Sequence, residues 1–259
     1  MKRLFQNAFR HHFVLQNFVS RDLKVKYRGT LFGYLWSLLE PLSLVLIYYF
    51  VFVIIARRGG PDYPLIVVLG ILPYTYFNSV VTGGSTALTK NRGLIRRVYL
   101  PRELFILGHA GSQTVVLLLS LIVVVPFSIA SGIYPGWRVV YALPAILLIG
   151  LTGTGLALVL SCANVLYRDV GYVLRVVLRL GFYGSPVIYP IELVPDRLLD
   201  LYALNPMAVY LTMMRSAFMN RPLPIGGAHV ALAVGVAIAI FAVGTQLFQR
   251  WQARAVKYL

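Results

Sequence analysis

The stretch RDLKVKYRGTLFGYLWSLLEPLSLVLIYYFVFVIIA, residues 21–56, decides the fold class of this chain. Its first eight residues are basic and amphipathic, and an apolar segment, Leu31–Ala56, follows without a linker. A helix needs about 20 mostly apolar residues to cross a bilayer. A cationic segment joined to such a helix is typical of a membrane protein whose N-terminus stays in the cytoplasm and whose surface helix lies on the bilayer.

The composition of the whole chain also indicates a membrane protein. Hydrophobic residues make up 59% of the sequence and charged residues only 12%, whereas soluble domains carry about 25% charged residues. A net charge of +16 would otherwise suggest nucleic acid binding. The positive charges lie mainly at the ends of the expected helices, so we expect topology rather than a nucleic-acid partner to explain them.

Six apolar segments are long enough to span a bilayer with some tilt. They are Leu31–Ala56, Pro64–Leu88, Leu104–Ala130, Val139–Tyr167, Val170–Tyr189 and His229–Phe248. With the N-terminus inside, 18 of the chain's 24 Lys and Arg residues fall in the inner connections, which predicts that both termini are cytoplasmic. We therefore expect an all-α integral membrane protein of six transmembrane helices (residues 31–259), preceded by a cytoplasmic region with an amphipathic interface helix (residues 1–30).

Two features inside these segments need a separate explanation. Arg175 and Arg179 interrupt the fifth segment and lie four residues apart, so they share a helix face that we expect to look at protein, water or the cytoplasmic end of the span rather than at lipid. Gly150, Gly153 and Gly155 superficially form a dinucleotide-binding pattern, but they lie in an apolar helix with no strand before them. We expect these small residues to let helices approach closely.

The connection between the fifth and sixth segments, residues 190–227, is neither a short turn nor a spanning helix. It contains acidic and basic residues and then a second apolar stretch, Met207–Met219. We interpret it as two short helices divided at Asn205–Pro206 that dip into the outer face of the bilayer. Such re-entrant pieces are tolerated only where protein or a water-filled cavity satisfies their backbone, which suggests a pore or gate. An ordinary extracellular loop is the alternative.

The loop between the second and third segments, residues 90–102, is basic and amphipathic. Leu94, Ile95 and Val98 fall at helical spacing, with basic residues between them. A short helix of this kind on the cytoplasmic face could lie on anionic lipid or dock in the groove of a partner. The spacing alone does not decide between these two possibilities.

Aromatic residues concentrate in the first two segments. An interfacial aromatic belt is one explanation, but the run from Tyr48 to Phe52 lies well inside the first segment. Aromatic faces in a polar channel can contact the C–H faces of sugar rings. Glu40 is an acid partway into the first segment, and it is either functional or paired with a polar neighbour at the interface. The channel-lining candidates are Tyr34, Trp36, Glu40, Tyr48, Phe52, Tyr76 and Tyr183.

The sequence carries no sign of enzyme machinery. It lacks a G-x-x-x-x-G-K-[ST] loop, so we do not expect this chain to bind ATP. Its four histidines form no metal-ligand pattern. We expect no catalytic residues, no metal and no cofactor in this chain.

Several short motifs follow one another along nearly the whole chain. They are Arg21-Asp22-Leu23-Lys24-x-Lys26-Tyr27-Arg28, Phe32-Gly33-Tyr34-Leu35-Trp36-Ser37-Leu38-Leu39-x-Pro41-Leu42, Asn91-x-x-Leu94-Ile95-x-x-Val98-x-x-Pro101, Tyr167-Arg168-Asp169, Ser185-Pro186-Val187-Ile188-Tyr189-Pro190 and Asn205-Pro206. In this order, the set resembles the membrane subunit of ABC-2 type polysaccharide exporters, which include O-antigen, capsule and teichoic acid permeases.

The resemblance implies a set of partners and roles. Two copies would pair around a channel in the bacterial cytoplasmic membrane, surrounded by membrane lipids, and two separate ATPase subunits carrying ATP and Mg would dock beneath them. The cargo would be a lipid-linked glycan. The residues that couple the chain to the ATPase would be Asn91, Leu94, Ile95, Arg97, Val98 and Tyr99. The interface helix would use Arg21, Asp22, Lys24, Lys26, Tyr27 and Arg28. The outer gate would use Pro186, Tyr189, Asn205 and Pro206.

Three alternatives remain at this point. An exporter of drugs or small lipids from the same superfamily would share the fold, but the aromatic first segment and the outer segment favour a glycan. A membrane-embedded transferase would need a catalytic acid or histidine at the membrane surface, and no paired carboxylates are visible. A secondary transporter would need more intramembrane charge for ion coupling.

Overall fold

The fold comes from a computed structural model that describes residues 2–55, 57, 60–167 and 169–258. Every regular element among them is a helix, and they contain no strand, which confirms the all-α class. The α-helices are α1 (Lys2–Arg10), α2 (His12–Tyr27), α3 (Trp36–Tyr49), α4 (Tyr63–Ser85), α5 (Ala87–Lys90), α6 (Arg92–Arg97), α7 (Glu103–Ser120), α8 (Val124–Ser131), α9 (Ala142–Leu166), α10 (Val170–Tyr183), α11 (Asp196–Ala203), α12 (Pro206–Phe218) and α13 (Gly227–Val256). The predicted positions Ala56 and Arg168 lie outside the described residues.

Within the described residues, four helices are long and apolar enough to cross a membrane. They are Tyr63–Ser85, Glu103–Ser131, Trp137–Leu166 and Gly227–Ala255, and they match the second, third, fourth and sixth expected segments. The first expected segment holds only a shorter apolar helix, Pro41–Ile55, whose last turns are a π-helix. Six crossings therefore stay a prediction.

The fifth expected segment is shorter in the structure than in the sequence interpretation. Helix α10 has 14 residues and ends at Tyr183 instead of continuing to Tyr189. Gly184 forms its C-cap, and Pro186 follows two residues later. A residue that precedes proline is disfavoured in helical conformation, which explains why the chain leaves the helix before Pro186.

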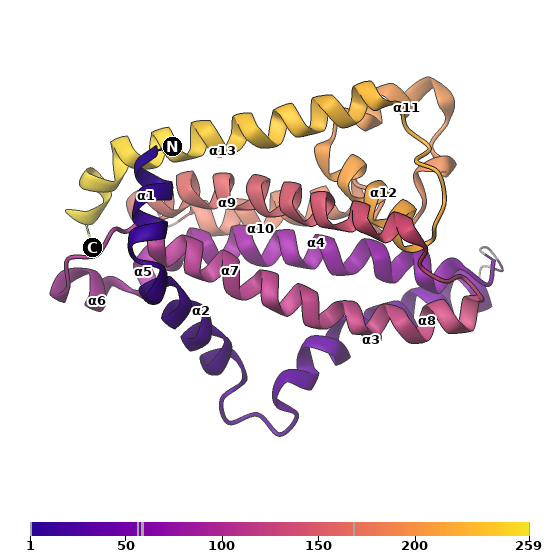
Figure 1. The fold of residues 1–259 in the computed structure, drawn as a ribbon, viewed down its shortest axis with the longest axis horizontal. Helices are drawn as coiled ribbons and strands as arrows, with labels where there is room; N and C mark the ends of the chain where they lie inside the picture. Colours follow the sequence, from indigo (N-terminus) through magenta and orange to yellow (C-terminus); the bar gives the residue numbers. More distant parts are fainter. Residues whose placement is uncertain (1, 56, 58–59, 168, 259) are drawn as a thin grey trace.

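The four long helices run side by side along the long axis of the molecule (Figure 1). Both chain termini, α1 and α6 lie at one end, which we call the terminal end. Helices α11 and α12 lie at the opposite end, which we call the far end. Helices α2 and α3 form a V that projects from the bundle, and Leu31 at its tip is 99% exposed.

Helix α9 is the centre of the bundle, packing against both α4 and α13. A Cβ atom at Gly155 would lie 2.7 Å from the Cα of Phe241, and one at Gly244 would collide with the backbone of Gly155. Gly153 leaves room for the side chain of Val80 on α4, which would lie 3.1 Å from a Cβ atom there. The expectation that these glycines permit close helix contact is therefore confirmed.

Candidate functional site

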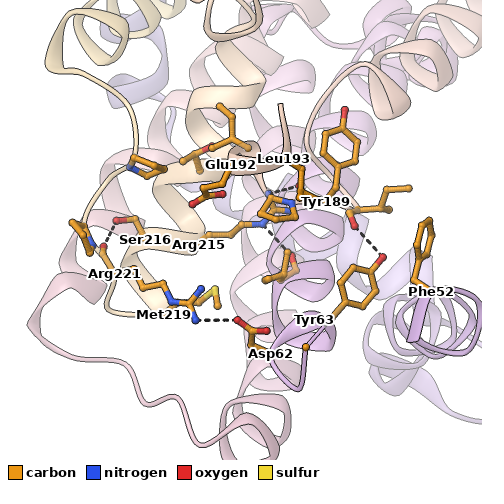
Figure 2. Close-up of a pocket in the computed structure, with 18 residues that line it drawn as sticks. Phe52, Asp62, Tyr63, Tyr189, Glu192, Leu193, Arg215, Ser216, Met219 and Arg221 are labelled. Atoms are coloured by element: carbon orange, nitrogen blue, oxygen red, sulfur yellow. Dashed lines mark hydrogen bonds and ion pairs between the residues drawn. The ribbon is translucent and has the colours of Figure 1, made fainter. Parts of the chain in front are cut away.

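The far end of the molecule holds a cavity of about 720 Å³. Its walls come from the start of α4, the segment 187–193 that ends in a short 3-10 helix (Ile191–Leu193), and helix α12 with the loop that follows it (Figure 2). Aromatic side chains, two acids and two arginines line it together. Those labelled in Figure 2 are Phe52, Asp62, Tyr63, Tyr189, Glu192, Leu193, Arg215, Ser216, Met219 and Arg221.

Arg215 holds the segment 187–193 against α4. Its side chain is only 6% exposed, and its guanidinium donates hydrogen bonds to three backbone carbonyls: Ile66 at 3.1 Å, Val187 at 2.8 Å and Tyr189 at 2.9 Å. Burial lowers the pKa of Arg215 to about 10, partly offset by Glu192, so the group remains charged at neutral pH. The planar fork of arginine is suited to joining several acceptors at once.

Further contacts fix the same segment from both sides. The hydroxyl of Tyr63 donates to the carbonyl of Ile188 at 3.0 Å. Gly70 supplies the space on α4, because a Cβ atom there would collide with the carbonyl of Val187. The segment is thus held by a phenol, a guanidinium and a close backbone approach.

The four predicted outer-gate residues come together around this segment. Asn205 caps α12 by accepting from the Met207 amide at 3.0 Å, and it donates to Ser185 Oγ at 2.9 Å. Pro206 occupies the first turn of α12, where proline is favoured because the N–H that it lacks has no partner within the helix. The hydroxyls of Tyr189 and Tyr202 are hydrogen bonded to each other, which ties the segment to α11. The two short helices divided at Asn205–Pro206 are present, while their role as a gate stays a prediction.

An ion pair closes one side of the cavity. Arg221 donates to Asp62 Oδ2 at 2.9 Å and so joins the loop after α12 to the residue that precedes α4. The hydroxyl of Ser216 donates to the carbonyl of Arg221, which fixes the turn. The pair is partly exposed, so its contribution to stability is small.

The basic segment that was expected as an interface helix belongs to α2, which begins already at His12 and forms one arm of the V that projects from the bundle (Figure 1). Phe18 of α2 stacks on Phe105 of α7, with ring centroids 4.8 Å apart. Lys24 and Lys26 are exposed, whereas Arg28 follows the helix in extended conformation. The side chain of Tyr27 lies outside the described residues.

Asp22 faces the bundle rather than the surroundings. It accepts from Arg21 at 2.8 Å and lies 3.6 Å from Nδ1 of His109 on α7. Burial acts to raise the pKa of Asp22, but the neighbouring His109 and the hydrogen bond from Arg21 outweigh it and lower that pKa below its usual value. Asp22 therefore anchors α2 to α7.

The predicted coupling helix is shorter than residues 90–102. Helix α6 covers only Arg92–Arg97, and Val98 is already extended. Leu94 and Ile95 are partly buried and pack against the core of the terminal end, and their role in docking a partner stays a prediction. Val98 and Tyr99 are exposed apolar and aromatic residues of this loop, at 46% and 98%. Arg97 is exposed beside them, and Asn91 caps α5 through the carbonyl of Ala87.

The predicted channel-lining residues divide into different environments. Tyr48, Phe52 and Tyr63 form one row of aromatic contacts, with Phe52 and Tyr63 centroids 5.7 Å apart. Tyr183 contacts Phe182, which in turn contacts Tyr74 on α4.

Trp36 and Tyr76 do not join these rows. Trp36 is 47% exposed near the tip of the V, against Phe32. Tyr76 is buried, and its hydroxyl is hydrogen bonded to Thr114 at 2.8 Å, so its surroundings are those of a packing residue. The side chains of Tyr34 and Glu40 lie outside the described residues.

Sequence reasoning missed Arg215 and Asp62. Arg215 is the one charge within the apolar stretch Met207–Met219, and an ionisable residue in such a stretch is a functional candidate by default. That signal was present, whereas nothing in the sequence connects Asp62 with Arg221. Among the described residues, no group of His, Cys, Asp and Glu could hold a metal ion.

Comparison with known proteins finds a matching transporter family and several similar transport proteins. The family model described as "ABC-2 type transporter" matches residues 14–219. The chain is 31% identical over 252 residues to an "O-antigen export system permease protein" of Myxococcus xanthus, covering 96% of each chain. It is 27% identical to a protein of the same description in Klebsiella pneumoniae, covering 93% of this chain and 92% of that protein. A "Polysialic acid transport protein" of Escherichia coli is 23% identical, with 88% and 90% covered.

Proposed function

The chain belongs to the ABC-2 type transporter family, and on that premise we propose that it is the membrane permease subunit of an ATP-driven exporter of lipid-linked polysaccharide. The observation that carries the proposal is the match to an O-antigen export permease over 96% of both chains. The polysialic acid transport protein extends the likeness to a second kind of polysaccharide. ATP hydrolysis then belongs to a separate ATPase subunit, because this sequence has no phosphate-binding loop.

In the proposed arrangement, the terminal end is cytoplasmic and the far end faces outward. The basic residues of α6 and of the last turns of α13 lie at the terminal end, as the positive-inside rule requires of a cytoplasmic face. The ATPase would dock on the exposed residues after α6, and the far-end cavity with Arg215 would form the outer gate. A second copy of the chain would complete the channel beside the aromatic rows of Tyr48 and Tyr183.

A complementation experiment tests the proposal. A bacterial strain that lacks its own O-antigen permease would receive this chain with its cognate ATPase subunit, and surface glycan would be measured by antibody labelling of intact cells. We expect surface glycan only when both proteins are present. Glycan that remains inside the cells, although both proteins are made, would contradict the assignment.

Two controls separate the alternatives. The purified chain alone should hydrolyse no ATP; appreciable hydrolysis would contradict the division of labour between the subunits. Efflux of fluorescent drugs and short-chain lipids should be unchanged by the chain. Efflux without glycan export would favour the exporter of small molecules.

A further inference from the structure

A groove of about 600 Å³ runs between the second half of α4 and the length of α10. Three cationic side chains line it: Lys90, Arg175 and Arg179. The opposite wall carries the amide of Asn78 and the hydroxyl of Thr82. The described residues that line this α4–α10 groove include no Asp or Glu.

Membrane topology alone does not account for these cations. Arg179 stands nine residues after Val170, the first residue of α10, which places it about 14 Å along the helix axis. An arginine so far from the helix start faces a protein-lined or watery space and is functional by default. A topology signal would instead cluster at the helix end.

The distribution of side chains around α10 supports the same conclusion. The opposite face of the helix lines an apolar groove against α9 through Val170, Val173 and Val177. The arginines are therefore collected on the side of α10 that faces α4. This separation gives the α4–α10 groove a cationic wall beside an apolar helix face.

Aromatic residues lie next to the cations. Tyr74, Phe182 and Tyr183 line the groove beyond Arg179, and the ring of Phe182 packs edge-on against Tyr74 at 5.3 Å. Arginine guanidinium groups bind phosphate oxygens in bidentate geometry, and aromatic faces contact sugar rings. The groove thus presents phosphate-binding groups beside sugar-binding surfaces.

We propose that the α4–α10 groove binds the phosphate-bearing headgroup of the lipid-linked glycan, with Arg175 and Arg179 on the phosphate and the exposed Tyr183 beside the first sugar. This proposal rests on the proposed function, since it names the chemical group by which that cargo is recognised. Lys90, at the end of α5, extends the cationic wall to the terminal end. The phosphate then enters from the terminal end and moves along a cationic path before it meets the aromatic residues.

A binding measurement on the full-length chain in phosphatidylcholine nanodiscs tests the site. One fluorescent probe is a short polyprenyl pyrophosphoryl disaccharide, and the other is the same polyprenyl disaccharide without phosphate. We expect the first probe to bind at least about tenfold more tightly, as loss of charge-assisted hydrogen bonds would predict. The double variant R175Q/R179Q should lose this preference.

The chain offers a matched control for that variant. Arg250 and Arg254 lie four residues apart on the exposed surface of α13, also at the terminal end. R250Q/R254Q removes the same charge at the same spacing and should keep the preference. If R175Q/R179Q does not fold, as judged by circular dichroism and gel filtration, the single variant R179Q should still reduce the preference.

Several results would overturn the proposal. Equal binding of both probes by the unmodified chain, or an unchanged preference in R179Q, would show that these arginines do not recognise phosphate. Loss of the preference when phosphatidylglycerol is added to the nanodiscs would assign the groove to ordinary bilayer phospholipid. Because this assay uses neither ATPase nor export, a chain that prefers phosphate but restores no surface glycan would count against the proposed function alone.

Discussion

The guanidinium of Arg215 is 2.8 Å from the carbonyl oxygen of Val187, and Gly70 lies directly beneath this contact. Helix α12, the segment 187–193 and α4 therefore meet at one point of the far end. The contact is buried, so each group depends on the others for its hydrogen bonds.

Replacement of Gly70 by alanine should loosen the far end. The added Cβ atom would collide with the carbonyl of Val187, and such overpacking costs about 1–3 kcal/mol. Thermal unfolding in detergent would measure the loss. Gly235→Ala in α13 is the control, because a Cβ there meets nothing within 4 Å; equal loss in both variants would contradict the packing argument.

Replacement of Arg215 by methionine should release the segment 187–190. Three backbone carbonyls would lose their donor, and we expect a loss of roughly 2–5 kcal/mol because hydrogen bonds to charged groups contribute more than neutral ones. Denaturant unfolding would measure this, and a cysteine placed at Ile188 would react faster with a water-soluble thiol reagent. Arg215→Lys should restore only part of the stability, since an ammonium lacks the planar fork. Full restoration would show that charge alone matters.

Tyr99→Asp should reduce binding of the ATPase subunit without loss of the membrane fold. Tyr99 is 98% exposed just after α6, so its replacement removes no internal contact. Co-purification of the two subunits would give the result, with Tyr134→Asp, an exposed tyrosine outside this region, as the control. Leu94→Asp should instead lower protein abundance, because Leu94 packs against the core. Normal co-purification of Tyr99→Asp would place the docking surface elsewhere.

Asp22→Asn should destabilise the contact between α2 and α7 in a pH-dependent manner. Since the pKa of Asp22 is lowered in the folded chain, its ionised form stabilises the fold above the unfolded pKa, and that contribution is lost as the pH falls through the folded value. At neutral pH we expect a loss of about 1 kcal/mol. Unfolding measured from neutral pH to below pH 4 should show the two proteins converge. Asp200→Asn, which removes a carboxylate that is 89% exposed, should change little at any pH.

Tyr48→Ala should impair glycan export more than it lowers protein abundance. Tyr48 belongs to the aromatic row with Phe52 and is only partly buried where it packs against the core. Tyr76→Ala gives the contrast, since loss of a buried aromatic side chain costs about 3–5 kcal/mol and should lower abundance first. Surface glycan per molecule of chain is the quantity to compare. A parallel fall of abundance and export in Tyr48→Ala would identify it as a packing residue.

The sequence was sufficient for the fold class because apolar length determines which helices can cross a membrane. It also located the break at Asn205–Pro206, since a capping residue before proline is a local signal. The sequence interpretation placed the end of α10 too late, because the helix ends at Gly184 and Pro186, which lie inside an apolar run. It also failed to separate Tyr76 from Tyr48, because the partner of Tyr76 is Thr114 on a different helix.

The sequence did not predict which side chains of a helix are buried and which are exposed. Leu94 and Ile95 have the spacing expected of a docking face, yet the terminal-end core covers them. An amphipathic pattern predicts that the apolar face of a helix will be buried, but it does not predict whether a partner or the chain itself buries that face. Arg215 shows the converse, because a single charge in an apolar stretch indicated burial in protein without naming its acceptors.

The contact between Gly155 and Gly244 constrains how this molecule can change shape. At that crossing the two backbones touch, so no layer of side chains lies between α9 and α13 that could switch rotamers to allow sliding. The pair therefore keeps α9 and α13 fixed against each other, and we expect a transport cycle to move other helices relative to these two.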